Sequence, residues 1–161
     1  MKQVQYKRFN NLIPLTLDSL YEGNQKTYND LKQNIKNVIE VEAPVTLNTL
    51  KARLREAFGV AKISQKALDI INEILADLHV IETDNLFETV LWPASGIFDM
   101  DAFRVNSERL IYDIPYQEMI ILFREYELEG EALYREILAY FNLQVLTKKA
   151  ENYLSFVESK L

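Results

Sequence analysis

The stretch that decides the fold runs from residue 44 to residue 79 and reads PVTLNTLKARLREAFGVAKISQKALDIINEILADLH. Its apolar side chains recur at three- and four-residue intervals, which predicts two amphipathic helices after a short extended piece at residues 44–46. Gly59 stands where a left-handed residue often closes a helix, and Ser64 is a favourable N-cap for the next one. Two helices joined by a short turn are the centre of a helix-turn-helix.

The flanking sequence extends this centre on both sides. Residues 28–42 have a helical apolar pattern that ends before Pro44, because the residue before a proline is biased away from the helical region. Residues 80–83 and 87–92 are β-prone and flank the turn-competent pair Asp84-Asn85, which predicts a hairpin. The order of helix, strand, helix, helix and hairpin predicts a winged-helix unit over residues 28–92. Residues 1–27 are expected to form an arm or linker with a short extended piece at residues 3–6.

The pattern of this unit returns 83 positions later. Apolar residues match apolar residues across the shift, with Leu50, Leu54 and Phe58 meeting Leu133, Ile137 and Phe141. The two caps match as well: Gly59 meets Asn142, and Ser64 meets Thr147. We therefore expect a second helix-turn-helix unit over residues 114–161, with a first helix at residues 116–126 and a linker over residues 93–113. Its wing is missing, either lost or removed by truncation. The predicted fold is mainly α with a small β-hairpin, built as tandem winged-helix or helix-turn-helix units.

The composition excludes several kinds of site. The chain has no cysteine and a single histidine, so zinc-thiolate sites, disulfides and metal sites with two histidine ligands cannot be built. This is consistent with a reducing, cytoplasmic setting, and no apolar run reaches the roughly 20 residues of a membrane span. Asp99 and Asp101 form an acidic pair of a kind that is common in linkers. We expect no catalytic residues, no metal, no cofactor and no membrane partner.

Five short motifs, in a fixed order, carry a resemblance to a known family. They are VEAPV at 41–45, RL at 53–54 with FGV at 58–60, LWP at 91–93, FR at 103–104 and DIPYQE at 113–118. In this order they resemble a C-terminal domain of unknown function in large bacterial superfamily-one helicase-like proteins, over about residues 33–161. Those proteins often carry a Vsr-like endonuclease domain. The resemblance implies an accessory role in DNA processing or defence beside helicase or nuclease domains, in cis or in trans, and no catalytic residues of its own.

The charge of the chain is unevenly distributed. The net charge is −6, but residues 44–66 carry a net +4, whereas residues 67–103 carry a net −8 with no lysine or arginine. Such asymmetry either bears on partners or reflects solvated faces that segregated by chance.

Nucleic-acid contact is the first functional interpretation. In a helix-turn-helix the second helix enters the major groove with its N-terminal residues, and the preceding helix crosses the backbone. The candidate phosphate-contacting residues are Lys51, Arg53, Arg55, Lys62, Ser64, Gln65 and Lys66, with Lys148 and Lys149 in the second unit. The predicted helix that begins after Ser64 carries Asp69, Glu73 and Asp77 further along, and these acidic residues would repel phosphates. We therefore expect weak contact with DNA rather than sequence-specific reading.

Protein interaction is the alternative interpretation. The acidic residues Asp69, Glu73 and Asp77, with Phe87 and Trp92 nearby, would then form a contact face. Through this face the module would dock on a helicase or nuclease body, or would pair with another copy as a homo-oligomer.

Overall fold

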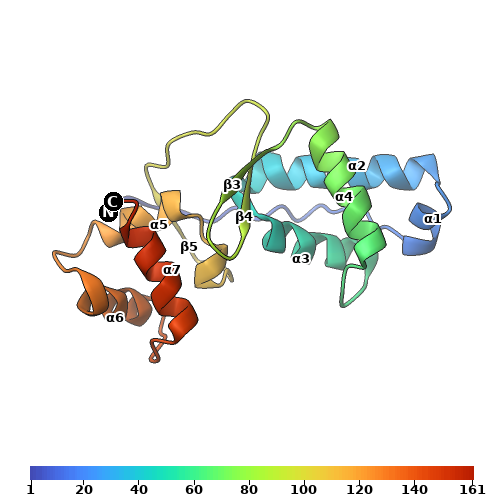
Figure 1. Cartoon of the computed structure of the whole chain (residues 1–161). Helices are drawn as coiled ribbons and strands as arrows, with labels where there is room; N and C mark the ends of the chain where they lie inside the picture. The colour runs from blue at the N-terminus through green and yellow to red at the C-terminus, as the bar shows by residue number, and fades with distance from the viewer. The chain divides into compact units, whose positions relative to one another are not determined.

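The computed structural model describes all residues from 1 to 161 and shows a mainly α protein with two compact units (Figure 1). The first unit comprises residues 7–83 and 89–97, and the second comprises residues 1–6, 84–88 and 98–161. Each unit has its own cluster of buried apolar side chains. The second unit therefore takes in the N-terminus of the chain and the tip of a hairpin, as well as the C-terminal part.

The first unit is built on four helices, namely α1 (Leu17–Tyr21), α2 (Gln25–Glu42), α3 (Leu47–Phe58) and α4 (Gln65–Asp77). The longest of them, α2, contacts both α3 and α4. It begins three residues before the expected start because Asn24 caps it, its side chain accepting a hydrogen bond from the Thr27 amide at 3.0 Å. It ends at Glu42, as expected, because Ala43 is extended before Pro44.

A small antiparallel sheet completes the first unit. Its strands are β2 (Val45–Thr46), β3 (Ile81–Asp84) and β4 (Thr89–Trp92), in the spatial order β2-β4-β3. Val45 lies opposite Leu91, and Thr46 lies opposite Val90. The predicted extended piece and the predicted hairpin are both confirmed, with strands shorter than the β-prone runs that suggested them.

The second unit contains two short parallel strands and three α-helices. The strands β1 (Gln3–Gln5) and β5 (Phe103–Val105) pair with Gln3 opposite Phe103. The 3₁₀ turn η1 (Ile111–Asp113) then leads into α5 (Tyr116–Phe123), α6 (Gly130–Tyr140) and α7 (Lys148–Glu158). The extended piece expected near the N-terminus is thus a paired strand, and α5 ends three residues before the expected end of that helix.

The two units repeat the same local structure at the offset of 83 residues. Helix α3 begins at Leu47 and α6 begins at Gly130. The next helices are capped by Ser64 and Thr147, each of which accepts a hydrogen bond from the amide three residues later at 3.1 Å. In both units the backbone has a left-handed residue after the preceding helix: Gly59 with φ 67° in the first and Asn142 with φ 59° in the second. The internal repeat is therefore present in the backbone as well as in the sequence.

Two segments are more structured than the sequence indicates. Residues 1–27, expected as an arm, contain α1 and bury Leu15 and Leu20 in the first core. Residues 93–113, expected as a linker, contain β5 and bury Phe103 and Ile111 in the second core. Both segments lack a sustained period, so only their tertiary burial distinguishes them from solvent-exposed connections.

Candidate nucleic-acid interface

The start of α4 holds three of the candidate phosphate-contacting residues, and all three have intramolecular partners. Ser64 caps the helix, and its hydroxyl lies 2.5 Å from the hydroxyl of Tyr21. Lys66 lies over the same tyrosine ring, with Nζ 4.5 Å from its centroid, and Gln65 donates to Asp69. A ligand that used these side chains would therefore have to displace contacts with α1 and within α4.

The candidates on α3 and in the turn that follows it divide into two groups. Arg53 donates to both carboxylate oxygens of the buried Glu42, at 3.0 and 2.8 Å, and only 12% of its side chain is exposed. It is a structural residue, so its assignment to phosphate contact is a correction to the sequence analysis. Lys51 and Arg55 are half-buried, Lys62 is exposed, and none of these three forms a salt bridge. Because residues four apart share one side of a helix, Lys51 and Arg55 lie on the same side of α3.

The acidic residues of α4 form an exposed row. Asp69, Glu73 and Asp77 recur at four-residue intervals, so they share one side of the helix. Asp77 accepts a hydrogen bond from Lys32 at 2.9 Å, and this bond, together with the positive charge of Lys32, holds the pKa of Asp77 below its ordinary value. Lys32 offsets the charge of Asp77, whereas the carboxylates of Asp69 and Glu73 repel phosphate along the exposed side of α4.

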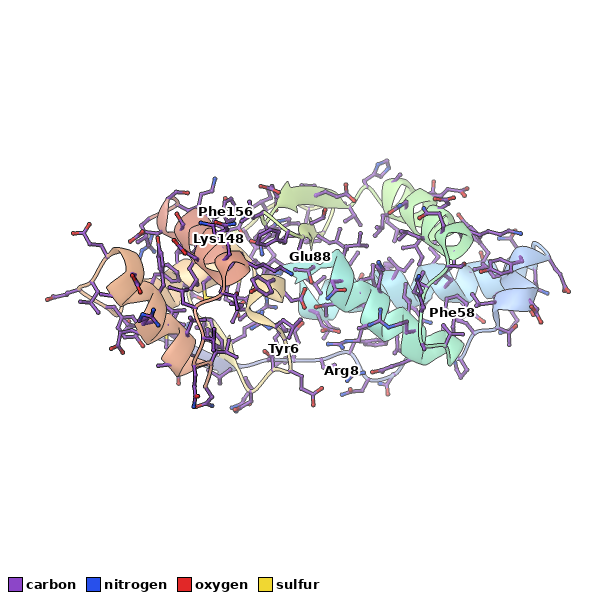
Figure 2. The ribbon with its side chains drawn as sticks, turned by 60° about the horizontal axis from the view of Figure 1, so that its bottom comes forward. Tyr6, Arg8, Phe58, Glu88, Lys148 and Phe156 are labelled. Carbon is purple, nitrogen blue, oxygen red and sulfur yellow. The ribbon has the colours of Figure 1, made fainter.

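The start of α7 in the second unit resembles the start of α4. Thr147 caps the helix, and Lys149 lies over two aromatic rings, with Nζ 4.3 Å from the Tyr112 centroid and 5.2 Å from that of Phe87. Lys148 is exposed and lies at the beginning of the helix (Figure 2). Each unit thus places a lysine of its last helix on a tyrosine, which comes from α1 in the first unit and from η1 in the second.

The aromatic residues proposed for a protein contact face differ in exposure. Trp92 is fully buried, and its indole N–H donates to the Thr83 hydroxyl at 2.8 Å. Its assignment to a contact face is therefore wrong, because burial in the hairpin leaves no part of the ring for a partner. Phe87 is 43% exposed and packs edge-to-face against Tyr112 in the second unit. In the first unit, the expected contact face therefore consists of the exposed acidic row of α4, without Trp92.

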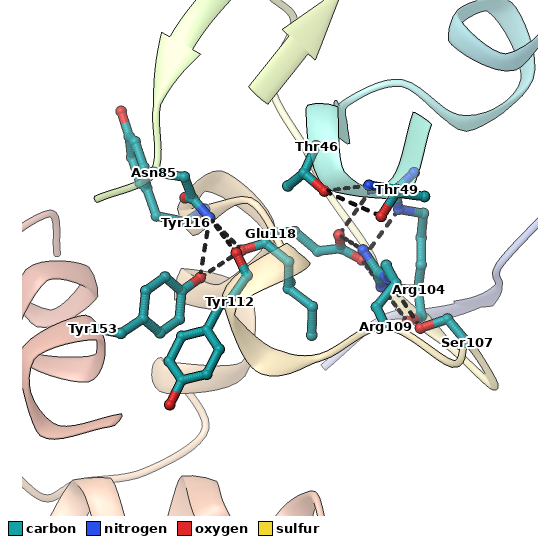
Figure 3. Close-up of polar contacts among 11 residues, drawn as sticks. Thr46, Thr49, Asn85, Arg104, Ser107, Arg109, Tyr112, Tyr116, Glu118 and Tyr153 are labelled. Atoms are coloured by element: carbon teal, nitrogen blue, oxygen red, sulfur yellow. Dashed lines mark hydrogen bonds and ion pairs between the residues drawn. The ribbon is translucent and has the colours of Figure 1, made fainter. Parts of the chain in front are cut away.

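A buried ion cluster in the second unit is absent from the sequence analysis. Glu118 on α5 is fully buried and accepts hydrogen bonds from the guanidinium groups of Arg104 and Arg109, the shortest at 2.6 Å (Figure 3). The backbone amide of Arg104 also donates to this carboxylate, at 2.9 Å. The available signal was a glutamate directly before the apolar run Met119–Phe123 of α5, since carboxylates are rarely buried unless they are paired.

Burial and ion pairing act in opposite directions on Glu118. Burial by itself raises the pKa of the Glu118 carboxyl, but the hydrogen bonds and charge of Arg109, together with those of Arg104, outweigh it and leave the pKa below its ordinary value. Both arginines also lie against the Tyr6 ring, with guanidinium carbons 4.9 and 4.5 Å from its centroid. The cluster connects Tyr6, the residue after β1, with β5 and α5, and its charges are paired within the fold.

The tip of the hairpin supplies a second buried polar group. The Asn85 side chain donates to the carbonyls of Tyr112 and Ile114 and accepts from the Tyr116 amide at 2.8 Å (Figure 3). The hydroxyl of Tyr153 donates to the same Ile114 carbonyl, and burial raises the pKa of this tyrosine well above its ordinary value. These hydrogen bonds satisfy the buried backbone groups around η1. They therefore stabilise the start of α5 and do not leave a reactive group free.

Part of the chain is similar to a protein family of unknown function. A family model described as a protein of unknown function (DUF3320) matches residues 18–66. The match runs from α1 to the first turn of α4 and includes the turn with Lys62 and Ser64. No curated protein and no solved structure matches the chain.

Two further observations bear on what the chain can bind. No helix combines the length and the apolar character that crossing a bilayer requires. No group of three or more metal-ligating side chains comes together, and Asp101 of the acidic pair binds Lys2 at 3.0 Å. The remaining candidates are therefore the unpaired cations of α3 and the α3–α4 turn, and the acidic row of α4.

Proposed function

We propose that the chain is a non-catalytic accessory domain that contacts nucleic-acid phosphates weakly through the α3–α4 corner, defined here by Lys51, Arg55 and Lys62. The observation that carries this proposal is that these three cations form no salt bridge within the protein. Cations without an internal counter-ion can exchange their water and counter-ions for phosphates, which is the main source of affinity for nucleic acid.

The fold of the first unit supports the same proposal. Its order of helix, strand, two helices and hairpin, with the strand order β2-β4-β3, is the arrangement we expect of a winged helix. In helix-turn-helix proteins the helix before the recognition helix crosses the phosphate backbone. In this unit that helix is α3, which carries Lys51 and Arg55. The helicase- or nuclease-like context, in DNA processing or defence, rests on the family resemblance of the five motifs.

The contacts that residues of α4 make within the protein indicate how nucleic acid would be bound. Ser64, Gln65 and Lys66 already have partners, and the acidic row follows them on α4. Base reading needs the start of this helix inside the major groove, where the acidic row would meet the flanking phosphates. We therefore propose phosphate contact by the corner without sequence-specific reading.

The test is a binding titration by fluorescence anisotropy, using the full chain with a labelled duplex and a single strand of equal length. With about three phosphate contacts, log Kobs for the duplex should fall with log salt at a slope of roughly −3. The variant Lys51→Glu/Lys62→Glu should lose binding. The charge-matched control Lys7→Glu/Lys36→Glu changes two exposed lysines elsewhere in the first unit and should retain most of the binding. Undetectable binding at low salt, or equal loss in both variants, would contradict the proposal.

A protein-interaction role is the second candidate, and the exposed acidic row of Asp69, Glu73 and Asp77 favours it. In this case the chain would dock on a helicase or nuclease body, or on another copy, through α4. A pull-down with the candidate partner domains should then survive Lys51→Glu/Lys62→Glu and fail with Asp69→Lys/Glu73→Lys. The opposite pattern would rule out this role.

A further inference from the structure

The N-terminal segment of the first unit lies against α3 and is fixed there by hydrogen bonds of its backbone. The Phe9 amide donates to the carboxylate of Glu42 at 3.2 Å, and Glu42 also binds Arg53 of α3. Further along the segment, the Leu15 amide donates to the Ala57 carbonyl at 2.9 Å. The backbone of this segment is therefore held in one position beside α3, and so are the first atoms of its side chains.

Arg8 brings a positive charge from this segment to the surface of α3. Its Nη2 forms an ion pair with the carboxylate of Glu56, and 35% of the Arg8 side chain and 52% of the Glu56 side chain are exposed (Figure 2). The Nε of Arg8 is buried and has no hydrogen-bond partner. The pair with Glu56 is thus the only polar contact of the Arg8 side chain, and it lies at a surface that nucleic acid can approach.

Glu56 is the only acidic residue between positions 44 and 66, the stretch that contains all three cations of the α3–α4 corner. Each residue turns an α-helix by about 100°, so Glu56 lies on the side of α3 next to the one that carries Lys51 and Arg55. An uncompensated carboxylate in this place would repel the phosphates that the corner attracts. The ion pair with Arg8 offsets that charge.

We propose that Arg8 makes phosphate contact at the α3–α4 corner possible by compensating the charge of Glu56. Arg8 acts through Glu56, so it is a positioning residue and does not itself contact the nucleic acid. The inference rests on the proposed function, and it extends the interface to a residue 48 positions before Glu56 in the chain. The N-terminal segment then has a role in binding as well as in closing the first core.

The test is a double-mutant cycle, which measures the coupling between two residues, on the affinity of the full chain for a labelled duplex at low salt. Arg8→Gln should weaken binding by roughly threefold or more, because it leaves the carboxylate of Glu56 unpaired near phosphate, where salt screens the repulsion little. Glu56→Gln should strengthen binding by a similar factor. Arg8→Gln/Glu56→Gln should bind as the unmodified chain does. Exposed ion pairs contribute little to stability, so all three variants should fold, and circular dichroism checks this.

Two matched controls separate the ion pair from net charge. Lys7→Gln removes the neighbouring exposed lysine, which forms no ion pair with Glu56, and should weaken binding less than Arg8→Gln does. Arg8→Gln/Glu40→Gln has the same net charge as Arg8→Gln/Glu56→Gln but keeps the carboxylate of Glu56, so its binding should stay weak. Glu40 is exposed and lies about 200° around α2 from Glu42, the residue that binds α3.

The proposal is overturned if Arg8→Gln binds as tightly as the unmodified chain or no more weakly than Lys7→Gln. It is also overturned if Glu56→Gln does not restore the binding of Arg8→Gln, because Arg8 would then contact phosphate directly. Equal restoration by Glu40→Gln would show that net charge alone controls affinity. In each of these cases the unmodified chain binds, so the proposed function survives. A chain that does not bind the duplex at all contradicts the proposed function, and this inference with it.

Discussion

Glu42 and Glu118 are fully buried carboxylates, one in each unit, and each is bound by arginine and by a backbone amide. Phe9 donates its amide to Glu42 at 3.2 Å, and Arg104 donates its amide to Glu118 at 2.9 Å. Removing a carboxylate from water is costly unless such partners compensate for the lost hydration. At the scale of single residues, each core therefore contains one ion cluster that connects a helix to an extended segment.

Replacing Glu118 with glutamine should destabilise the protein strongly. The change leaves Arg104 and Arg109 without a counter-ion, and only 11% and 4% of their side chains are exposed. Losing one partner of a buried ion pair costs about 3 kcal/mol or more of unfolding free energy. Urea denaturation measures this loss. The control Glu131→Gln breaks the exposed pair with Arg135 and should cost well under about 1 kcal/mol; similar losses in the two variants would contradict the role of burial.

The same cluster predicts how stability depends on pH. The pKa of Glu118 is lower in the folded protein than its ordinary value, so its contribution is complete above the unfolded pKa of about 4.3 and disappears as the pH falls through the folded pKa. The stability difference between the unmodified chain and Glu118→Gln should therefore be constant from about pH 7 to pH 5 and should shrink at lower pH. A difference that stays constant in the acidic range, measured by urea denaturation at each pH, would show that Glu118 is not the group concerned.

At the scale of elements, helix limits follow from local sequence wherever a cap or a proline sets them. Ser64, Thr147 and Gly59 are in the cap positions that the sequence predicts, and α2 ends before Pro44. Asn24 extends α2 by three residues because a side-chain cap outweighs the weak apolar pattern of that turn. Short strands such as β1 and β5 are harder to predict, because their partners lie about a hundred residues apart in the chain.

The repeated left-handed positions give a prediction at this scale. Gly59→Ala should lower the unfolding free energy by about 1 kcal/mol, because a side chain disfavours positive φ. No atom lies near the position of the added Cβ, so the cost is conformational rather than steric. Asn142→Gly should be neutral or slightly stabilising, since Asn142 already has φ 59°. Thermal unfolding of the two variants checks this; a stabilising Gly59→Ala would contradict the left-handed cap.

At the scale of the whole molecule, the distribution of charge decides more than the net value of −6. The predicted positive stretch remains positive only in part, because Arg53 is neutralised by Glu42 within the core. The predicted negative stretch divides between the exposed row on α4, Glu82 on β3 and residues of the second unit. Weak phosphate contact by the α3–α4 corner beside a repulsive row is the binding behaviour that this distribution favours.

Neutralising the acidic row should therefore strengthen nucleic-acid binding. Asp69→Asn/Glu73→Gln removes two negative charges from α4 and should raise the affinity for a labelled duplex several-fold at low salt, because it reduces repulsion of phosphate. The control Glu127→Gln/Glu129→Gln removes two exposed carboxylates of the second unit and should have a smaller effect. If both variants bind equally well, then net charge and not the row on α4 controls affinity.

The sequence by itself determined the helices of both units apart from α1, the caps at Gly59, Ser64 and Thr147, the hairpin and the repeat at 83 residues, because apolar periodicity and capping act within a few neighbouring residues. Only the tertiary structure decided which polar and aromatic groups are free. It buried Trp92, paired Arg53 with Glu42 and Arg8 with Glu56, and joined Arg104 and Arg109 to Glu118. The reason is physical: availability to a partner depends on what covers a side chain, and those covering residues come from segments far away in the chain.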